Sequence, residues 1–342
     1  MSKLTHIFLF LLGLVATAWA LVSIDKMPFW TFSRQKACNL AIGIHECDTI
    51  FIGSSRVQRG ISPEIFDARM AELGQPALSF NFGMAGTLVH DFERQIDWIL
   101  EQNPGKLERI IVEAGTYEQR IRSGQWMRNL VVEAHEPTSL RSRLSSVIAM
   151  RRPLWEKVQV TGYVLAHTLT NSLRIGQGPR ILDDWCHRWT GRGFRRFGIL
   201  PGRGFMPITM ENAPNDIRRR QHQKWVANPK WAATMLDRKR SGGLPAEYRG
   251  GFDHVTCRRQ IARLKEAGIE LIYVVMPTYR NGFAGRDGLD DVANEVRIVR
   301  FDDPDAFPEL YGFENWFDAG HMSLSGAELF SARLAEALVN GK

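Results

Sequence analysis

Short apolar runs that end at glycine or proline alternate with helical patterns, and this order limits the fold of the chain. Three such runs (48–53, 78–83 and 108–115) precede residue 118, and 269–277 and a weaker run at 296–301 follow residue 250. Apolar runs of this length bounded by turn residues predict buried strands. Strands that alternate with helices form a mostly parallel sheet covered on both faces. The sequence therefore predicts an α/β fold.

Helix signals separate these strands. Ser62 precedes Pro63 at the start of one predicted helix, a serine cap followed by proline at the first helical position. Apolar residues recur at helical spacing over 87–103, and further helices are predicted over 254–267 and 323–340.

Residues 118–250 show no strand alternation, and we interpret them as a basic, Trp-rich, mainly helical insertion. They hold 24 Lys and Arg against 10 Asp and Glu, a local charge of +14, whereas the whole chain carries +7. Two interpretations of this charge are open: a solvated helical face, or a surface for anionic polysaccharide, lipid head groups or nucleic acid. The tryptophans could stack on sugar rings or pack inside the insertion.

The first 24 residues predict a signal peptide or an N-terminal membrane anchor. An apolar run from Ile7 to Val22 follows Lys3, and Ala18-Trp19-Ala20 offers a small-residue cleavage site. Either interpretation predicts a cell-envelope location, periplasmic or membrane-anchored and facing away from the cytoplasm. In an oxidising compartment Cys38 and Cys47 could form a disulfide, or both could be buried thiols.

The predicted strand ends carry the candidate chemistry, because ligands of parallel sheets bind at the carboxyl ends of the strands. Ser55 follows the first strand in FIGSSR (51–56), on a glycine-containing turn that exposes a nucleophile. Gly86 ends NFGMAG (81–86) after the second strand, where backbone N–H groups can approach a substrate. A serine nucleophile needs a base and a group that orients it. Asp318 and His321, three residues apart before the last helix, supply both.

Together these motifs resemble the SGNH (GDSL-type) hydrolase superfamily over residues 48–117 and 251–342. Gly53-Ser54-Ser55 is similar to the family's first block, with Ser55 in the place of the nucleophile. Asn81, Gly83 and Gly86 match the second block, in which Gly86 takes the oxyanion role. Asp318 and His321 match the last block, Asp-x-x-His before a helix.

The third block departs from the family pattern of Gly-x-Asn-Asp. This chain has Gly115-Thr116-Tyr117-Glu118, so the expected oxyanion asparagine is absent. Thr116 could donate a hydrogen bond in its place, or two backbone N–H groups could suffice. Loss of one such donor typically lowers the rate by about 10²–10³.

The resemblance implies a three-layer αβα flavodoxin-like fold, formed by residues 25–117 and 251–342 around the insertion. It implies an esterase or O-acyltransferase with the triad Ser55, His321 and Asp318, an oxyanion hole of Ser55, Gly86 and Thr116, and no metal or organic cofactor. The GSSR form, with an N-terminal apolar segment, resembles envelope members that work beside membrane-bound O-acyltransferases. The expected substrate is an acylated polysaccharide or another ester, and no nucleic acid is expected as partner. The alternative is a non-catalytic SGNH-fold partner of a membrane O-acyltransferase.

Three further residues are candidate substrate contacts. Arg56, like Arg59, follows the nucleophile and could bind an anionic substrate group or form an ion pair. Asn81 lies in the second block. His90 lies on the predicted helix that follows the loop of Gly86. It could contact the substrate or have only a structural role.

Overall fold

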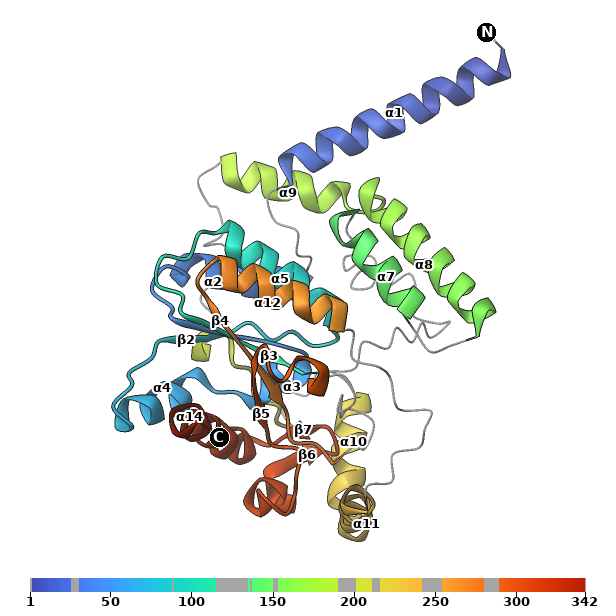
Figure 1. Ribbon diagram of the computed structural model, residues 1–342. Helices are drawn as coiled ribbons and strands as arrows, with labels where there is room; N and C mark the ends of the chain where they lie inside the picture. Colours follow the sequence, from blue (N-terminus) through green and yellow to red (C-terminus); the bar gives the residue numbers. More distant parts are fainter. Residues whose placement is uncertain are drawn as a thin grey trace. The chain divides into compact units, whose positions relative to one another are not determined.

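The computed structural model describes residues 2–25, 31–87, 89–114, 135, 137–149, 153–189, 201–210, 216–241, 254–279 and 289–341 (Figure 1). Two compact units divide the chain. The helical unit comprises residues 1–39 and 119–199, and the sheet unit comprises 40–118 and 200–342.

In the described part of the sheet unit, five parallel strands form a sheet in the order β2-β1-β3-β4-β5. Their bounds are Thr49–Ile52 (β1), Ser79–Asn81 (β2), Arg109–Glu113 (β3), Glu270–Val275 (β4) and Arg297–Arg300 (β5). All five lie within the runs that the sequence predicts, each a few residues shorter. The chain adds β2 on one side of β1 and then β3 on the other side. The order in which strands are added to the sheet therefore reverses between β1 and β3. Ligands of open α/β sheets bind at the carboxyl ends of the strands at such a point.

Helices cover both faces of this sheet, as the sequence predicts. In Figure 1, α5 (Val89–Glu101) and α12 (His254–Glu266) lie on one side of the strands, and α4 (Pro63–Glu72) and α14 (Leu324–Asn340) on the other. Within the described residues, this unit also has the α-helices α3 (Ser55–Gly60), α10 (Asp216–Val226) and α11 (Pro229–Arg240). It has the 3₁₀ turns η3 (Pro201–Gly204), η6 (Asp290–Val292), η7 (Pro308–Tyr311) and η8 (Phe313–Asn315) as well.

Two of the helix starts carry the caps that their sequences specify. The Ser62 hydroxyl accepts a hydrogen bond from the N–H of Ile65, and Pro63 occupies the first turn of α4. Ser323 caps α14 in the same way, through the N–H of Gly326. A side-chain oxygen at this position satisfies an N–H group that the helix itself leaves without a partner.

Helix α3 and the segment before α14 differ from the prediction. The short helix α3 begins at Ser55 itself. Residues 316–322 form a hairpin of two antiparallel strands, β6 (Trp316–Asp318) and β7 (His321–Met322), where no strand was predicted.

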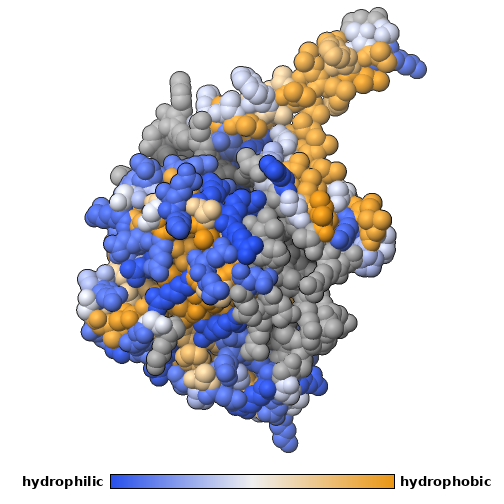
Figure 2. Space-filling model, viewed as in Figure 1, coloured by the Kyte–Doolittle hydropathy of each residue, from blue (hydrophilic) through white to orange (hydrophobic). Residues whose placement is uncertain are grey.

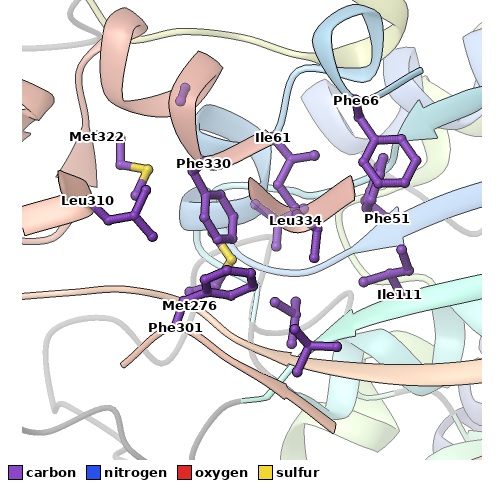
Figure 3. Packing of buried hydrophobic residues seen from close by; sticks show 14 of the residues in the cluster. Phe51, Ile61, Phe66, Ile111, Met276, Phe301, Leu310, Met322, Phe330 and Leu334 are labelled. Atoms are coloured by element: carbon purple, nitrogen blue, oxygen red, sulfur yellow. The ribbon is translucent and has the colours of Figure 1, made fainter. Parts of the chain in front are cut away.

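A single apolar cluster joins the sheet to α4 and α14 (Figure 3). Phe51 of β1 meets Phe66 of α4 edge to face, with ring centroids 5.0 Å apart. Phe330 of α14 meets Phe301 in the same way, also at 5.0 Å. These rings are fully buried, and such aromatic pairs favour edge-to-face packing. The cluster therefore fixes α14, and the hairpin that precedes it, against the sheet.

The helical unit contains α1 (Lys3–Ile24), η1 (Pro137–Ser139), α7 (Leu140–Ala149), α8 (Leu154–Ser172) and α9 (Gly178–Trp189). A further helix, α2 (Thr31–Gly43), crosses the boundary between the units. The described elements within 118–250 are all helices, and they divide between the units, because η3, α10 and α11 belong to the sheet unit.

The first helix, α1, is 22 residues long, and its length and composition are sufficient to cross a membrane. A signal sequence passes the same test, so both interpretations of the N-terminal segment stand.

Cys47 is a buried thiol that forms no disulfide, so the Cys38–Cys47 disulfide considered above is not formed in the structure. Burial raises the pKa of the Cys47 thiol to about 11, so this side chain is an inert part of the core.

We expect Phe330→Ala to lower the free energy of unfolding of the sheet unit by about 3–5 kcal/mol, because it leaves a cavity among fully buried rings. Leu324→Ala, an apolar truncation at the exposed start of the same helix, should change it by less than about 0.5 kcal/mol. Urea unfolding of the detergent-solubilised chain measures both. Equal losses of stability in the two variants would contradict this description of the core.

Candidate active site

The site centres on Ser55, the first residue of α3. Two residues, Gly53 and Ser54, separate it from the end of β1, and the Ser54 hydroxyl caps α3 by accepting from the N–H of Arg56. The Ser55 side chain is half-buried. Its Oγ lies 2.9 Å from Nε2 of His321, which is 266 positions later in the sequence.

His321 and Asp318 face each other across the β6–β7 hairpin. Nδ1 of His321 lies 3.0 Å from each carboxylate oxygen of Asp318, and the N–H of Gly320 donates to Asp318 Oδ1 at 2.7 Å. Both side chains are buried. The structure thus brings Ser55, His321 and Asp318 into one hydrogen-bonded chain.

The hydrogen bonds determine which nitrogen of His321 carries the proton. Because a carboxylate only accepts, Nδ1 must donate to Asp318, and this leaves Nε2 as an acceptor for the Ser55 hydroxyl. This is the tautomer in which imidazole can take a proton from a serine.

Burial and charge keep this base neutral. Burial lowers the pKa of His321, the hydrogen bond and charge of Asp318 raise it, and the cations of Arg218 and Arg59 lower it further, with a net decrease. Burial raises the pKa of Asp318, but the hydrogen bond and charge of His321, the Gly320 N–H and Arg218 together lower it to about 2. At neutral pH the pair is therefore a carboxylate and a neutral imidazole.

Glu113, which the sequence analysis did not single out, holds the turn that presents Ser55. It ends β3 and is almost fully buried; Oε2 accepts from the N–H of Ser54 at 2.6 Å, and Oε1 pairs with Arg56. A Cβ at Gly53 would lie 2.7 Å from this carboxylate, so only glycine leaves room for the contact. The signal in the sequence was an acidic residue at the carboxyl end of a buried strand.

The second block also holds α3 in place. Asn81 is fully buried; its Nδ2 donates to the carbonyls of Val57 at 2.7 Å and Ile61 at 2.6 Å, and its Oδ1 accepts from the N–H of Gly83. A Cβ at Gly83 would lie 2.5 Å from the backbone nitrogen of Gln58. The structure therefore gives Asn81 a positioning role, and its amide is used inside the protein rather than presented to a substrate.

The loop after β2 is bonded to the nucleophile turn. The N–H of Met84 donates to the carbonyl of Gly53 at 2.8 Å, and the Thr87 hydroxyl donates to the same carbonyl at 3.2 Å. Gly86 lies in this loop, exposed and with φ of 84°, a conformation that glycine adopts without strain.

Two predicted residues, Thr116 and His90, lie wholly or partly outside the described part of the chain. Thr116 and the rest of the third block lie outside the described residues. His90 lies in the first turn of α5, and its side chain is also outside the described part.

The two arginines of α3 differ in their partners. Arg56 forms the ion pair with Glu113, which is one of the two interpretations left open by the sequence. Arg59 lies four residues after Ser55, on the same side of a helix. Among the described residues, its buried Nε has no hydrogen-bond partner.

Arg218 of α10 is a second cation at the site, and the sequence analysis missed it. Its Nη1 donates to Asp318 Oδ2 at 3.3 Å and lies 3.4 Å from His321 Nδ1. Helix α10 is held beside β6 by side chains farther along the helix. Nδ1 of His222 lies 2.9 Å from the carbonyl oxygen of Phe317, and the buried ring of Trp225 stacks on that of Phe313. No local pattern distinguishes Arg218 from its neighbours Arg219 and Arg220.

Comparisons with protein-family models, with curated proteins and with solved structures return no match.

Replacing Arg218 should raise the pKa of His321. A nearby cation disfavours the imidazolium, so its removal in Arg218→Gln makes protonation easier. NMR titration of histidine-labelled protein, with the signal assigned by its loss in His321→Gln, should give a His321 pKa below that of a free imidazole in the parent and a higher pKa in Arg218→Gln.

Arg219→Gln is the matched control, since Arg219 is the next residue of α10 and pairs with Asp216 instead. A His321 pKa that is unchanged in Arg218→Gln, or equally changed in both variants, would contradict the electrostatic description of the site.

Proposed function

We propose that this chain is an SGNH-type serine esterase or O-acyltransferase of the cell envelope. The observation that carries the proposal is the 2.9 Å contact between Ser55 Oγ and His321 Nε2, with Asp318 behind the imidazole. A hydroxyl, a neutral imidazole and a buried carboxylate in this order make up the machinery of acyl transfer through serine.

The first half-reaction forms an acyl-enzyme. Ser55 Oγ attacks the carbonyl carbon of an ester while its proton passes to His321 Nε2. Asp318 stabilises the imidazolium that forms. The tetrahedral intermediate then expels the alcohol, which takes the proton from Nε2, and the acyl group remains on Oγ.

The second half-reaction transfers the acyl group. Water, or a sugar hydroxyl, gives its proton to Nε2 and attacks the acyl carbonyl, and Ser55 Oγ leaves with that proton. Water gives hydrolysis and a sugar hydroxyl gives O-acylation. The backbone N–H groups of Ser55 and Gly86, with Thr116 as the third candidate donor, would stabilise the negative oxygen.

Three features support an SGNH-type domain. The strand order is the 2-1-3-4-5 order of flavodoxin-like sheets. Ser55 and Gly86 follow neighbouring strands, β1 and β2, and the Asp318–His321 pair precedes the last helix. Gly326 is the third feature: a Cβ there would lie 2.0 Å from the carbonyl of Asn315, so glycine lets α14 begin directly against the turn before the hairpin.

The cations near the site favour a substrate with a negative group, such as an acidic envelope polysaccharide. Arg218 lies within 3.4 Å of the Asp318–His321 pair, and Arg59 is close enough to lower the pKa of His321. Burial and the neighbouring Arg218 lower the pKa of Arg59 itself. A substrate carboxylate or phosphate would relieve this repulsion between cations.

The alternative function is a non-catalytic SGNH-fold partner of a membrane O-acyltransferase. The sequence Gly115-Thr116-Tyr117-Glu118, which lacks the family asparagine, favours it. The hydrogen-bonded order of Ser55, His321 and Asp318 favours the enzyme, because a scaffold has no need of an aligned base.

Chemical labelling separates the two functions. A fluorophosphonate should label the folded parent chain, because Ser55 is activated by His321, and Ser55→Ala should abolish the labelling. Ser241→Ala, which changes an exposed serine at the end of α11, should retain it. A parent chain that is folded, with a native unfolding transition, and yet unlabelled would support the non-catalytic alternative.

Substrate charge can be tested at Arg59. We expect Arg59→Gln to lower kcat/KM about tenfold for 4-nitrophenyl hemisuccinate, which is anionic, and to leave the neutral 4-nitrophenyl acetate little changed; tenfold is about 1.4 kcal/mol. Arg69→Gln, which changes an arginine paired with Glu72 and Glu336 on α4, is the control. An equal loss for both esters would refute the anion-binding role.

A further inference from the structure

Helix α8 of the helical unit has a mostly polar buried face and an apolar exposed face. Helices of water-soluble proteins normally have the reverse arrangement. Its buried residues are Val164, His167, Thr168 and Asn171, of which three are polar. Leu154, Val158, Leu165 and Leu169 are instead exposed, at 77%, 62%, 47% and 60%. Their spacing of four, seven and four residues places all of them on one side of the helix.

Polar contacts attach the inward face of α8. Asn171 donates to the carbonyl of His135 at 3.2 Å, and its Oδ1 accepts from Arg174 at 2.6 Å and from Gln177 at 3.3 Å. The rings of His135 and His167 lie 4.8 Å apart. Hydrogen bonds to residue 135 and to the turn after α8 therefore satisfy the inward face, and the apolar side chains of the helix are left on the outward face.

The exposed apolar surface continues beyond α8. Ile175 lies in the turn between α8 and α9 and is 53% exposed, and Leu182 and Trp185 of α9 are 50% and 42% exposed. Trp155 lies at the other end, in the first turn of α8, and is also exposed. Tryptophan is enriched where a membrane meets water, because its ring is apolar and its N–H is polar.

The same unit contains the one helix among the described residues that is long and apolar enough to span a membrane. The carboxyl end of that helix, α1, is attached to the apolar surface. Asp25 caps α1, its carboxylate is buried, and it accepts from Arg180 of α9 at 2.7 Å and lies 3.8 Å from Arg174. Figure 2 shows the hydrophobic surface of α1 and further hydrophobic residues next to its base.

We propose that α8 and α9 lie in the interface of the lipid bilayer that α1 enters, with Leu154, Val158, Leu165 and Leu169 against the acyl chains. The occupant of this face is lipid rather than a protein groove, because the face begins at the end of α1, the helix whose length and composition suffice to cross a membrane, and because α8 and α9 both carry exposed tryptophan. This proposal is independent of the catalytic function. It assigns a second membrane contact to the chain, in addition to the N-terminal segment.

Fluorescence quenching by lipid tests this contact in the full chain. Cysteine is introduced at Val158, Leu165 or Leu169 in a Cys186→Ser background, since Cys186 is the exposed native cysteine and the other three are buried. Each cysteine is labelled with an environment-sensitive nitrobenzoxadiazole dye. The protein is then reconstituted in vesicles of phosphatidylcholine and phosphatidylglycerol, with or without bromine on the acyl chains.

We expect blue-shifted emission and strong quenching by brominated lipid at all three positions. The control is Leu324→Cys, an exposed leucine at the start of α14 in the sheet unit, which should show water-like emission and no quenching. Labelling of Ser55 by fluorophosphonate, where the parent shows it, and the native circular dichroism spectrum establish that each variant is folded.

Water-like emission at positions 158, 165 and 169 would overturn the proposal. Quenching of equal strength at position 324 would overturn it as well. Blue-shifted emission that is lost when the protein is diluted in excess lipid would identify a second copy of the chain as the occupant, and this too would contradict contact with lipid.

Discussion

The buried carboxylate of Glu113 is the contact on which the geometry of the site depends. It lies at the end of β3, next to β1, and accepts the N–H of Ser54 while it pairs with Arg56. Ser54 and Arg56 are the two chain neighbours of Ser55. One acidic side chain therefore fixes the orientation of the turn that presents the nucleophile at the end of β1. Asn81 of β2 also holds α3, because its side-chain amide donates hydrogen bonds to the carbonyls of Val57 and Ile61. The two strands that flank β1 thus hold a helix of only six residues, which could not stabilise itself.

The other half of the site comes from the end of the chain. The β6–β7 hairpin carries Asp318 and His321, and α14 ties it to the core through Phe330 and Leu334. Helix α10 adds Arg218 from within the basic region of the sequence. That region therefore contributes charge directly to the site, and part of its excess of arginine has a defined place in the sheet unit.

The sequence predicted what depends on local pattern. The five strands, the cap at Ser62, the last helix, and the placing of Ser55, Asp318 and His321 follow from apolar runs, turn residues and short spacings. It missed features that arise from tertiary partners. Glu113 and Arg218 become important only because distant segments meet them. Asn81 was expected to contact substrate, yet its amide is used entirely within the fold. The reversed polarity of α8 was also missed, because periodicity shows that a helix has two faces but not which one is buried.

The most direct test of the central claim is the crystal structure of the chain after reaction with a small fluorophosphonate. The account predicts a phosphorus–oxygen bond at Ser55 Oγ, His321 Nε2 within hydrogen-bonding distance of that oxygen, and the phosphonyl oxygen directed at the N–H groups of Ser55 and Gly86. An adduct on another residue, or a reacted Ser55 whose phosphonyl oxygen points away from both N–H groups, would contradict it.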